Sequence, residues 1–167
     1  MIKTQRLKSL NREWSYFPHK NIPIYNVSRN TMTEEQMNEF FDWCLHWCQK
    51  KFGKTKGKSI PQIEWNWNVT EYQKLNMLAE YEKQDNLILL RVQGHRTIYN
   101  LAKTIIHEYV HYLQPLHGNW YERYHCKYGY WKNPYEIEAY HIADLYAVEC
   151  TFDALCRMES IRIKMTL

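Results

Sequence analysis

Residues 97–114 have the sequence TIYNLAKTIIHEYVHYLQ and form the strongest helical pattern in the chain. The stretch begins with Thr97, a good N-cap residue, and ends before Pro115, which cannot continue a helix. Its apolar side chains recur every three or four residues, at Ile98, Ala102, Ile106, Val110 and Leu113. Because this spacing puts them on one face, we predict a helix over residues 97–114 that packs against the core.

The other face of this helix carries the motif HEYVH, with His107, Glu108 and His111. Histidines at positions i and i+4 lie one turn apart on the same face, so both imidazoles can bind one metal ion. Zn²⁺ accepts such ligands, and a catalytic site leaves a position for water, whose pKa falls to about 7. Glu108 is close enough to take a proton from that water. The alternative interpretation is an amphipathic helix with two solvated histidines.

A zinc site of this kind needs a third protein ligand, and the sequence offers Glu136, Glu138 and His117. His117 occupies the third-ligand position of the pattern HExxHxxGxxH, but Gln114 stands where that pattern requires Gly for a sharp break. Glu136 begins a stripe of small residues that would let its helix approach the histidines closely; the others are Ala139, Ala143, Ala147 and Cys150. Glu138 lies on a more mixed face. Glu136 could instead reach back to the Asn133 amide in a capping box, and Glu138 would then be the ligand.

Two further helices are predicted from their end signals. Thr33 and Gln36 resemble a capping box, which opens a helix through about Lys51. The last helix is predicted over residues 133–158, because Asn-Pro at its start supplies an N-cap followed by proline at the first helical position. The aromatic segment between the last two helices, residues 115–132, is predicted to be a loop.

Alternation of apolar and polar residues predicts a small sheet. Residues 62–67 have the pattern of a half-buried strand, and residues 78–83 and 86–92 flank a polar turn as a hairpin. Residues 1–32 give no firm pattern and are interpreted as an N-terminal arm, in which residues 21–27 could form a short strand. The predicted fold is α+β, with a small antiparallel sheet, an N-terminal helix, the HExxH helix and a C-terminal helix.

Composition excludes several classes of protein. Apolar residues make up 45% and charged residues 24%, a balance typical of a globular chain and not of a disordered one. No apolar run approaches the ~18 residues that cross a bilayer, and the N-terminus has no apolar signal-peptide core. The five cysteines are scattered without a CxxC pair, and Cys44 and Cys48, which lie at helical spacing, are interpreted as buried thiols in a reducing compartment. We therefore expect a cytoplasmic protein, of a cell or of an infected host, with no membrane contact.

The charge of the chain is mildly basic, with a formal net charge of +4. Lysines concentrate in the segment KKFGKTKGKS, which contains two glycines and is interpreted as a solvated loop over residues 50–58. A loop of this kind could make weak contacts to the phosphates of a nucleic acid.

Three stretches, EYEKQDNLILL, TIIHEYVHYLQ and NPYEIEA, resemble the compact zincin metallopeptidases of the minigluzincin and SprT-like kind, including versions common in phage genomes. The resemblance covers roughly residues 76–147. In that family a strand pair precedes the HExxH helix, and a downstream ExxA helix gives the third ligand. The resemblance implies zinc bound by His107, His111 and Glu136, with Glu108 as the base. Tyr140 stands where many relatives place an acidic residue that orients a histidine.

The length of the chain favours a single zincin-like domain over residues 1–167, and the resemblance implies that it hydrolyses peptide bonds in a protein or peptide substrate. The oxyanion of the reaction would be stabilised by a Tyr or His near the metal; the candidates are Tyr124, Tyr128, Tyr130, Tyr140, His125 and His141. Two alternatives stay open. One is an inactive zincin-fold module for binding, and the other is a DNA-associated protease of the SprT kind.

Overall fold

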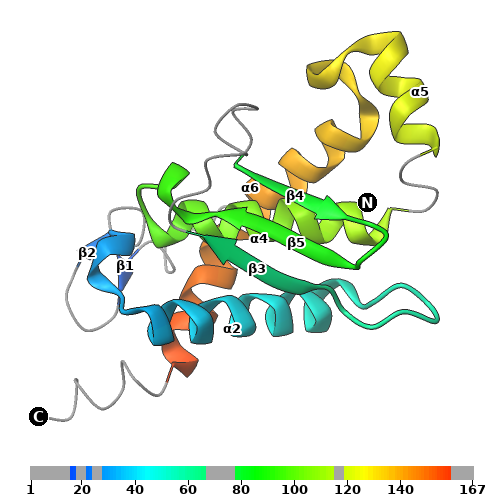
Figure 1. Cartoon of the computed structure of the whole chain (residues 1–167). Coiled ribbons are helices and arrows are strands. Elements are labelled where there is room, and N and C mark those ends of the chain that lie inside the picture. The colour runs from blue at the N-terminus through cyan, green and yellow to red at the C-terminus, as the bar shows by residue number, and fades with distance from the viewer. Residues whose placement is uncertain (1–15, 18–21, 24–27, 67–77, 115–118, 159–167) are drawn as a thin grey trace, which may run out of the picture.

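The computed structural model shows an α+β fold built around helix α4 (Ile98–Leu113). Helices α2 (Glu34–Phe52) and α6 (Pro134–Arg157) contact α4 and each other, and a small sheet lies against another side of α4 (Figure 1). The structure describes residues 16–17, 22–23, 28–66, 78–114 and 119–158. None of the helices in these ranges combines the length and the hydropathy of a membrane-spanning segment.

The end signals of the three long helices form as predicted. The Thr33 hydroxyl accepts a hydrogen bond from the Gln36 amide (3.3 Å), and the Gln36 side chain accepts one from the Thr33 amide (3.0 Å). Helix α2 ends at Gly53, whose φ of +82° favours glycine. Helix α4 begins after Thr97, and α6 begins after Asn133 with a proline in its first turn. The structure confirms these three helix predictions. They could be made from the sequence because each depends on contacts between residues that are close in sequence.

The sheet contains β3 (Gln62–Asn66), β4 (Ala79–Glu82) and β5 (Leu87–Arg91) in the order β3-β5-β4. Strands β4 and β5 form the predicted antiparallel hairpin. Strand β3, however, pairs with β5 in parallel, so the prediction of a purely antiparallel sheet is wrong. The Asn86 side-chain amide, just before β5, donates hydrogen bonds to the carbonyl oxygens of Ser59 and Ile60, just before β3. Both strands therefore begin at the same end of the sheet.

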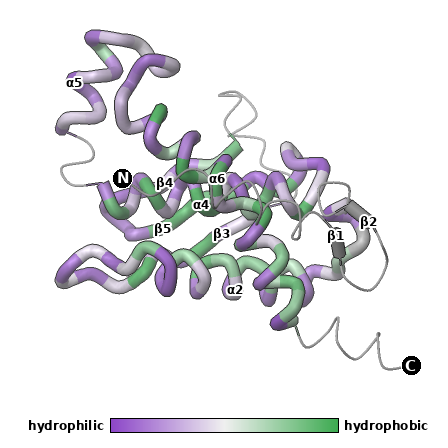
Figure 2. The backbone as a smooth tube through the Cα atoms, turned by 180° about the vertical axis from the view of Figure 1, so that it is seen from behind, coloured by the Kyte–Doolittle hydropathy of each residue, from purple (hydrophilic) through white to green (hydrophobic). Residues whose placement is uncertain are grey.

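The segment predicted as a loop contains helix α5 (Asn119–Tyr128) and the 3₁₀ turn η4 (Tyr130–Lys132). No residue of α5 is buried, and the helix projects from the body of the molecule (Figure 1). Figure 2 shows α5 mostly in hydrophilic to neutral colours, in contrast to α4 and β5. The prediction of a loop is therefore wrong for residues 119–128, where aromatic residues recur at helical spacing as Trp120, Tyr121, Tyr124 and Tyr128.

The N-terminal arm is described only in part. Strands β1 (Tyr16–Phe17) and β2 (Ile22–Pro23) pair in an antiparallel manner, and the turn η2 (Arg29–Thr31) leads into α2. Most of the predicted short strand at residues 21–27 lies outside the described residues. The turn η3 (Val92–Gly94) connects β5 to the segment that precedes α4.

The stripe of small residues on α6 lies in the core. Its members are all fully buried: Ala139, Ala143, Ala147 and Cys150. They share a face with Glu136, and α6 packs extensively along α4. Small side chains at this interface let the two helices approach closely enough for a carboxylate on α6 to reach side chains on α4.

We expect Ala139→Leu to lower the free energy of unfolding by about 1–3 kcal/mol, because three additional carbon atoms must fit into a closely packed interface. His141 is exposed on the same helix, so His141→Leu is the matched control, with an expected change within about 0.5 kcal/mol. Chemical denaturation of both variants measures the difference. Equal stability of the two variants would show that the α4–α6 interface tolerates larger side chains.

Candidate metal centre

Three side chains from α4 and α6 converge on one point: His107, His111 and Glu136. The two Nε2 atoms of the histidines are 3.1 Å apart, His107 Nε2 lies 3.2 Å from Glu136 Oε2, and His111 Nε2 lies 3.4 Å from Glu136 Oε1. Ligands at 2.0–2.1 Å around a tetrahedral ion are separated by about 3.3–3.4 Å. The spacing of the three side chains therefore matches a tetrahedral ion.

The burial and the hydrogen bonding of the three side chains also favour a bound cation. All three side chains are buried, with exposed fractions of 8% for His107, 5% for His111 and 3% for Glu136. Among the described residues, His107 Nε2 lies 3.2 Å from Glu136 Oε2, but no donor reaches this oxygen with the geometry of a full hydrogen bond. A buried carboxylate oxygen without a partner is costly unless a cation compensates for its charge. Two imidazoles and one carboxylate are a donor set that suits a divalent transition metal.

The charges of the group are strongly coupled. Burial alone would raise the pKa of Glu136, but hydrogen bonding to His107 and His111 outweighs burial and holds this pKa below its ordinary value. Burial likewise would lower the pKa of His111, but the neighbouring carboxylates of Glu136 and Glu108 raise it above its ordinary value. The site therefore attracts positive charge, whether a proton or a metal ion carries it.

Gln114, at the end of α4, orients His111. Its Oε1 atom accepts a hydrogen bond from His111 Nδ1 (2.8 Å), which places Nε2 toward the group. The Gln114 amide nitrogen donates to the carbonyl oxygen of Tyr135 and to Glu138 Oε2, both at 3.0 Å. Glu138 is exposed and bound to Gln114, so the structure does not bring it into the group with His107, His111 and Glu136. In the sequence, Gln114 is notable only because it stands where the pattern HExxHxxGxxH has Gly, and its hydrogen bond to His111 was not predicted.

Tyr121, on α5, fixes the carboxylate. Its hydroxyl donates to Glu136 Oε1 (2.7 Å), and its ring lies edge-on to the His111 ring at a centroid distance of 6.0 Å. Burial and the neighbouring Glu136 raise the pKa of Tyr121, so the hydroxyl keeps its proton and acts as a donor. This role of Tyr121 is not predictable from the sequence, because the contact joins two segments that only the tertiary structure brings together.

His107 has a different environment from His111. Its Nδ1 atom has no hydrogen-bond partner among the described residues, and its ring packs against the Tyr140 ring at a centroid distance of 4.4 Å. Tyr140 thus contacts His107 through its ring and not through a charged group. The orientation of His107 depends on packing, whereas that of His111 depends on a hydrogen bond.

Glu108 lies beside the group and is buried, with an exposed fraction of 6%. Burial raises the pKa of Glu108 above its ordinary value, although both histidines act to lower it. Glu108 lines the same cavity as His107, His111 and Glu136. A carboxylate in this position can accept a proton from a molecule bound next to the three converging side chains.

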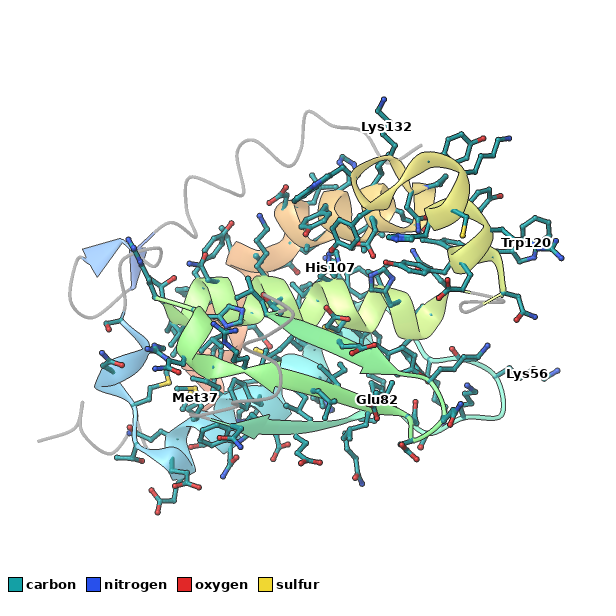
Figure 3. All side chains as sticks on the ribbon, turned by 45° about the horizontal axis from the view of Figure 1, so that its top comes forward. Met37, Lys56, Glu82, His107, Trp120 and Lys132 are labelled. Atoms are coloured by element: carbon teal, nitrogen blue, oxygen red, sulfur yellow. The ribbon has the colours of Figure 1, made fainter. Side chains whose placement is uncertain are left out.

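These residues open into a cavity of about 790 Å³. One wall is formed by residues 78–81, which include all of strand β4 except Glu82, and another by Tyr130, Trp131 and Tyr140. Of the six residues considered as oxyanion donors, Tyr130 and Tyr140 line the cavity, whereas Tyr124, Tyr128, His125 and His141 do not. His117 lies outside the described residues. Figure 3 shows His107 between the ribbon of α4 and the segments above it, with Trp120 and Lys132 farther out.

The lysine-rich loop lies apart from the cavity. Tyr109 donates a hydrogen bond to the Gly53 carbonyl oxygen (2.7 Å), and Thr55 bonds to Tyr112, so the base of the loop is fixed to α4. Lys51 pairs with Glu149 on α6, whereas Lys50, Lys54, Lys56 and Lys58 are exposed. Figure 3 shows Lys56 pointing away from the body. Nucleic-acid contact through this loop stays a prediction.

Comparisons of the chain with protein-family models, with curated proteins and with solved structures find no match.

We expect Gln114→Ala to weaken binding of Zn²⁺ by about 10–100-fold, because His111 loses the hydrogen bond that orients its ring. Competition with a zinc-binding dye measures the affinity. Gln62 is exposed on β3, so Gln62→Ala is a glutamine control and should leave the affinity unchanged. Unchanged affinity in Gln114→Ala would show that packing alone orients His111.

Proposed function

We propose that this chain is a zinc-dependent metallopeptidase of the compact zincin type. The observation that carries the proposal is the convergence of His107, His111 and Glu136 within 4.8 Å, with buried Glu108 beside them in a cavity. The donor set supports zinc, because catalytic zinc in peptidases is bound by two imidazoles and one carboxylate and keeps one coordination position open for water. The order of a strand pair, the HExxH helix and the ExxA helix supports the likeness to minigluzincins and SprT-like proteins.

Each residue then has a distinct role. His107, His111 and Glu136 would hold the ion, Gln114 would orient His111, and Tyr121 would orient Glu136. Zinc bound there supplies Lewis-acid polarisation of the scissile carbonyl and lowers the pKa of water. The Glu108 carboxylate accepts a proton from the attacking water and donates it to the leaving amine.

The position of β4 supports a peptide as the substrate. Within the described sheet, β4 is an outer strand, and Ala79 and Glu80 line the cavity. An extended peptide can add to the edge of a sheet through main-chain hydrogen bonds. Such an arrangement would place a peptide bond of the substrate alongside His107 and Glu108 without requiring a particular side chain.

Metal removal and restoration test the proposal. We expect the full chain to cleave a quenched fluorogenic peptide library when it contains about one zinc ion per chain. Dialysis against a chelator should abolish cleavage, and an equimolar amount of Zn²⁺ should restore it. Zinc binding without cleavage of any peptide would favour the inactive binding module, and the absence of zinc binding would contradict both.

The SprT-like alternative requires an additional property, because a DNA-associated protease must bind DNA. The exposed lysines of residues 50–58 favour it. Binding of a single-stranded oligonucleotide at low salt, weakening steeply as salt increases, would support it. No binding at low salt would exclude it and leave the peptidase proposal intact.

A further inference from the structure

Three of the six large apolar side chains that are exposed in the described residues line the cavity, whereas Trp120, Tyr128 and Ile137 do not. Trp131 is 77% exposed, Leu78 is 45% exposed and Tyr130 is 36% exposed, and all three line the cavity. Trp131 and Tyr130 belong to η4 on one wall, whereas Leu78 precedes β4 on the other. Water therefore contacts apolar surface on both sides of the entrance, which is typical of a binding site.

The aromatic wall is ordered by contacts among its own rings. Trp131 stacks on Tyr140 with an interplanar angle of 24° and a centroid distance of 6.1 Å. The hydroxyl groups of Tyr130 and Tyr140 are 3.2 Å apart, and the Tyr130 ring lies edge-on to Trp131 at 5.2 Å. Tyr140 in turn packs against His107 at 4.4 Å. The wall therefore extends from an exposed Trp to a proposed metal ligand without a break.

Leu78, at the start of the β4 side of the cavity, lies close to Gly94. A Cβ atom at position 94 would lie 2.4 Å from Leu78 Cδ2, so the absence of a side chain at Gly94 lets Leu78 adopt this position. Gly94 itself lines the cavity. The cavity thus presents apolar side chains both from η4 and from the residue that precedes β4.

The charges around the cavity favour an apolar occupant. Lys103 lines the cavity, but it forms an ion pair with Asp144 on α6. Glu108 and Glu136 belong to the metal centre, and Glu80 is on β4. Two uncharged residues lie next to Trp131 on the aromatic wall, Tyr130 and Tyr140. The aromatic wall therefore offers no ion-pair partner to a charged substrate side chain.

We propose that Trp131, supported by Tyr140, forms a specificity subsite for a large apolar side chain, aromatic or aliphatic, of the peptide substrate. The subsite rests on the proposed peptidase function and specifies its substrate class. Trp131 is the specificity-determining residue, because its ring is the most exposed of the wall and is fixed by stacking.

Binding of defined peptides tests the subsite independently of catalysis. The probes are blocked hexapeptides of Ala and Ser with one central Phe, Leu, Arg or Gly, and calorimetry measures their affinity for the zinc-loaded full chain carrying Glu108→Gln. We expect the Phe and Leu peptides to bind more tightly than the Gly peptide. Adding Trp131→Ala should weaken binding of the Phe peptide about tenfold and change binding of the Gly peptide by less than about twofold. Trp120→Ala is the matched control, because Trp120 is 38% exposed on α5 and does not line the cavity.

Cleavage by the chain with Glu108 intact separates this proposal from the previous one. Loss of Phe-peptide binding in Trp131→Ala supports the subsite even if the intact chain cleaves no peptide, a result that would overturn only the peptidase function. Cleavage of Phe and Gly peptides with equal kcat/KM, unchanged by Trp131→Ala, would overturn the subsite and leave the peptidase function standing. A preference for the Arg peptide would also overturn it, because the Trp face would then bind a cation.

Discussion

Glu108→Gln is expected to lower kcat for peptide hydrolysis by about 10²–10⁴-fold, while the chain still binds about one zinc ion. The amide of Gln has nearly the shape of the carboxylate but cannot accept a proton from water. Glu108 is buried beside the three converging side chains and is not one of them, so its replacement should leave the metal in place. Steady-state kinetics and elemental analysis of the same preparation measure both quantities.

A matched control distinguishes loss of the base from a general effect of removing a carboxylate. Glu64 is exposed on β3 and does not line the cavity, so Glu64→Gln should retain the wild-type kcat. If Glu108→Gln kept full activity with zinc bound, Glu108 would not be the base. Loss of zinc from that variant would instead place Glu108 among the ligands.

His111→Ala should weaken zinc binding by more than about 100-fold, because loss of a ligand must exceed the effect of losing a residue that only orients one. The side chain removed supplies Nε2 at 3.1 Å from His107 Nε2 and 3.4 Å from Glu136 Oε1. Elemental analysis after dialysis measures zinc content. Thermal unfolding gives a second readout, because a ligand bound only to the folded state raises Tm.

The control for this variant is His46→Ala. His46 is exposed on α2, where its ring contacts Trp43, so its loss should leave zinc content unchanged. We expect added Zn²⁺ to raise the Tm of the wild type and of His46→Ala, and to leave that of His111→Ala unaltered. Equal zinc content in all three proteins would contradict the assignment of His111 as a ligand.

The long helices could be predicted from the sequence because their signals are local. Thr33 with Gln36 and Thr97 with Asn100 bond within one turn, and the apolar spacing of α4 is independent of the rest of the fold. The direction of β3 could not be predicted in the same way. The parallel direction of β3 is associated with hydrogen bonds from the Asn86 side chain to the chain just before β3. The alternating pattern of a strand indicates which side chains are buried, but it does not indicate which strand lies beside it or in which direction.

The candidate site likewise contains residues that the sequence could predict and residues that it could not. The spacing of His107 and His111 follows from helix geometry alone, and the small residues of α6 favoured Glu136 over Glu138. The hydrogen bonds from Tyr121 to Glu136 and from His111 to Gln114 were not predicted. The first depends on how α5 folds back against α6, and the second on a side-chain orientation that no sequence pattern specifies.

Helix α5 has ten residues and none of them is buried. Isolated helices of this length are marginal in water, since about 12–15 residues are needed even in favourable sequences. Its order therefore depends on a few contacts to α6, chiefly Tyr121 with Glu136 and Tyr124 with Tyr135. The carboxylate that receives the Tyr121 hydrogen bond also faces both imidazoles, so fraying of α5 and occupancy of the centre are thermodynamically linked. An ion that fixes Glu136 also raises the free energy required to detach this helix.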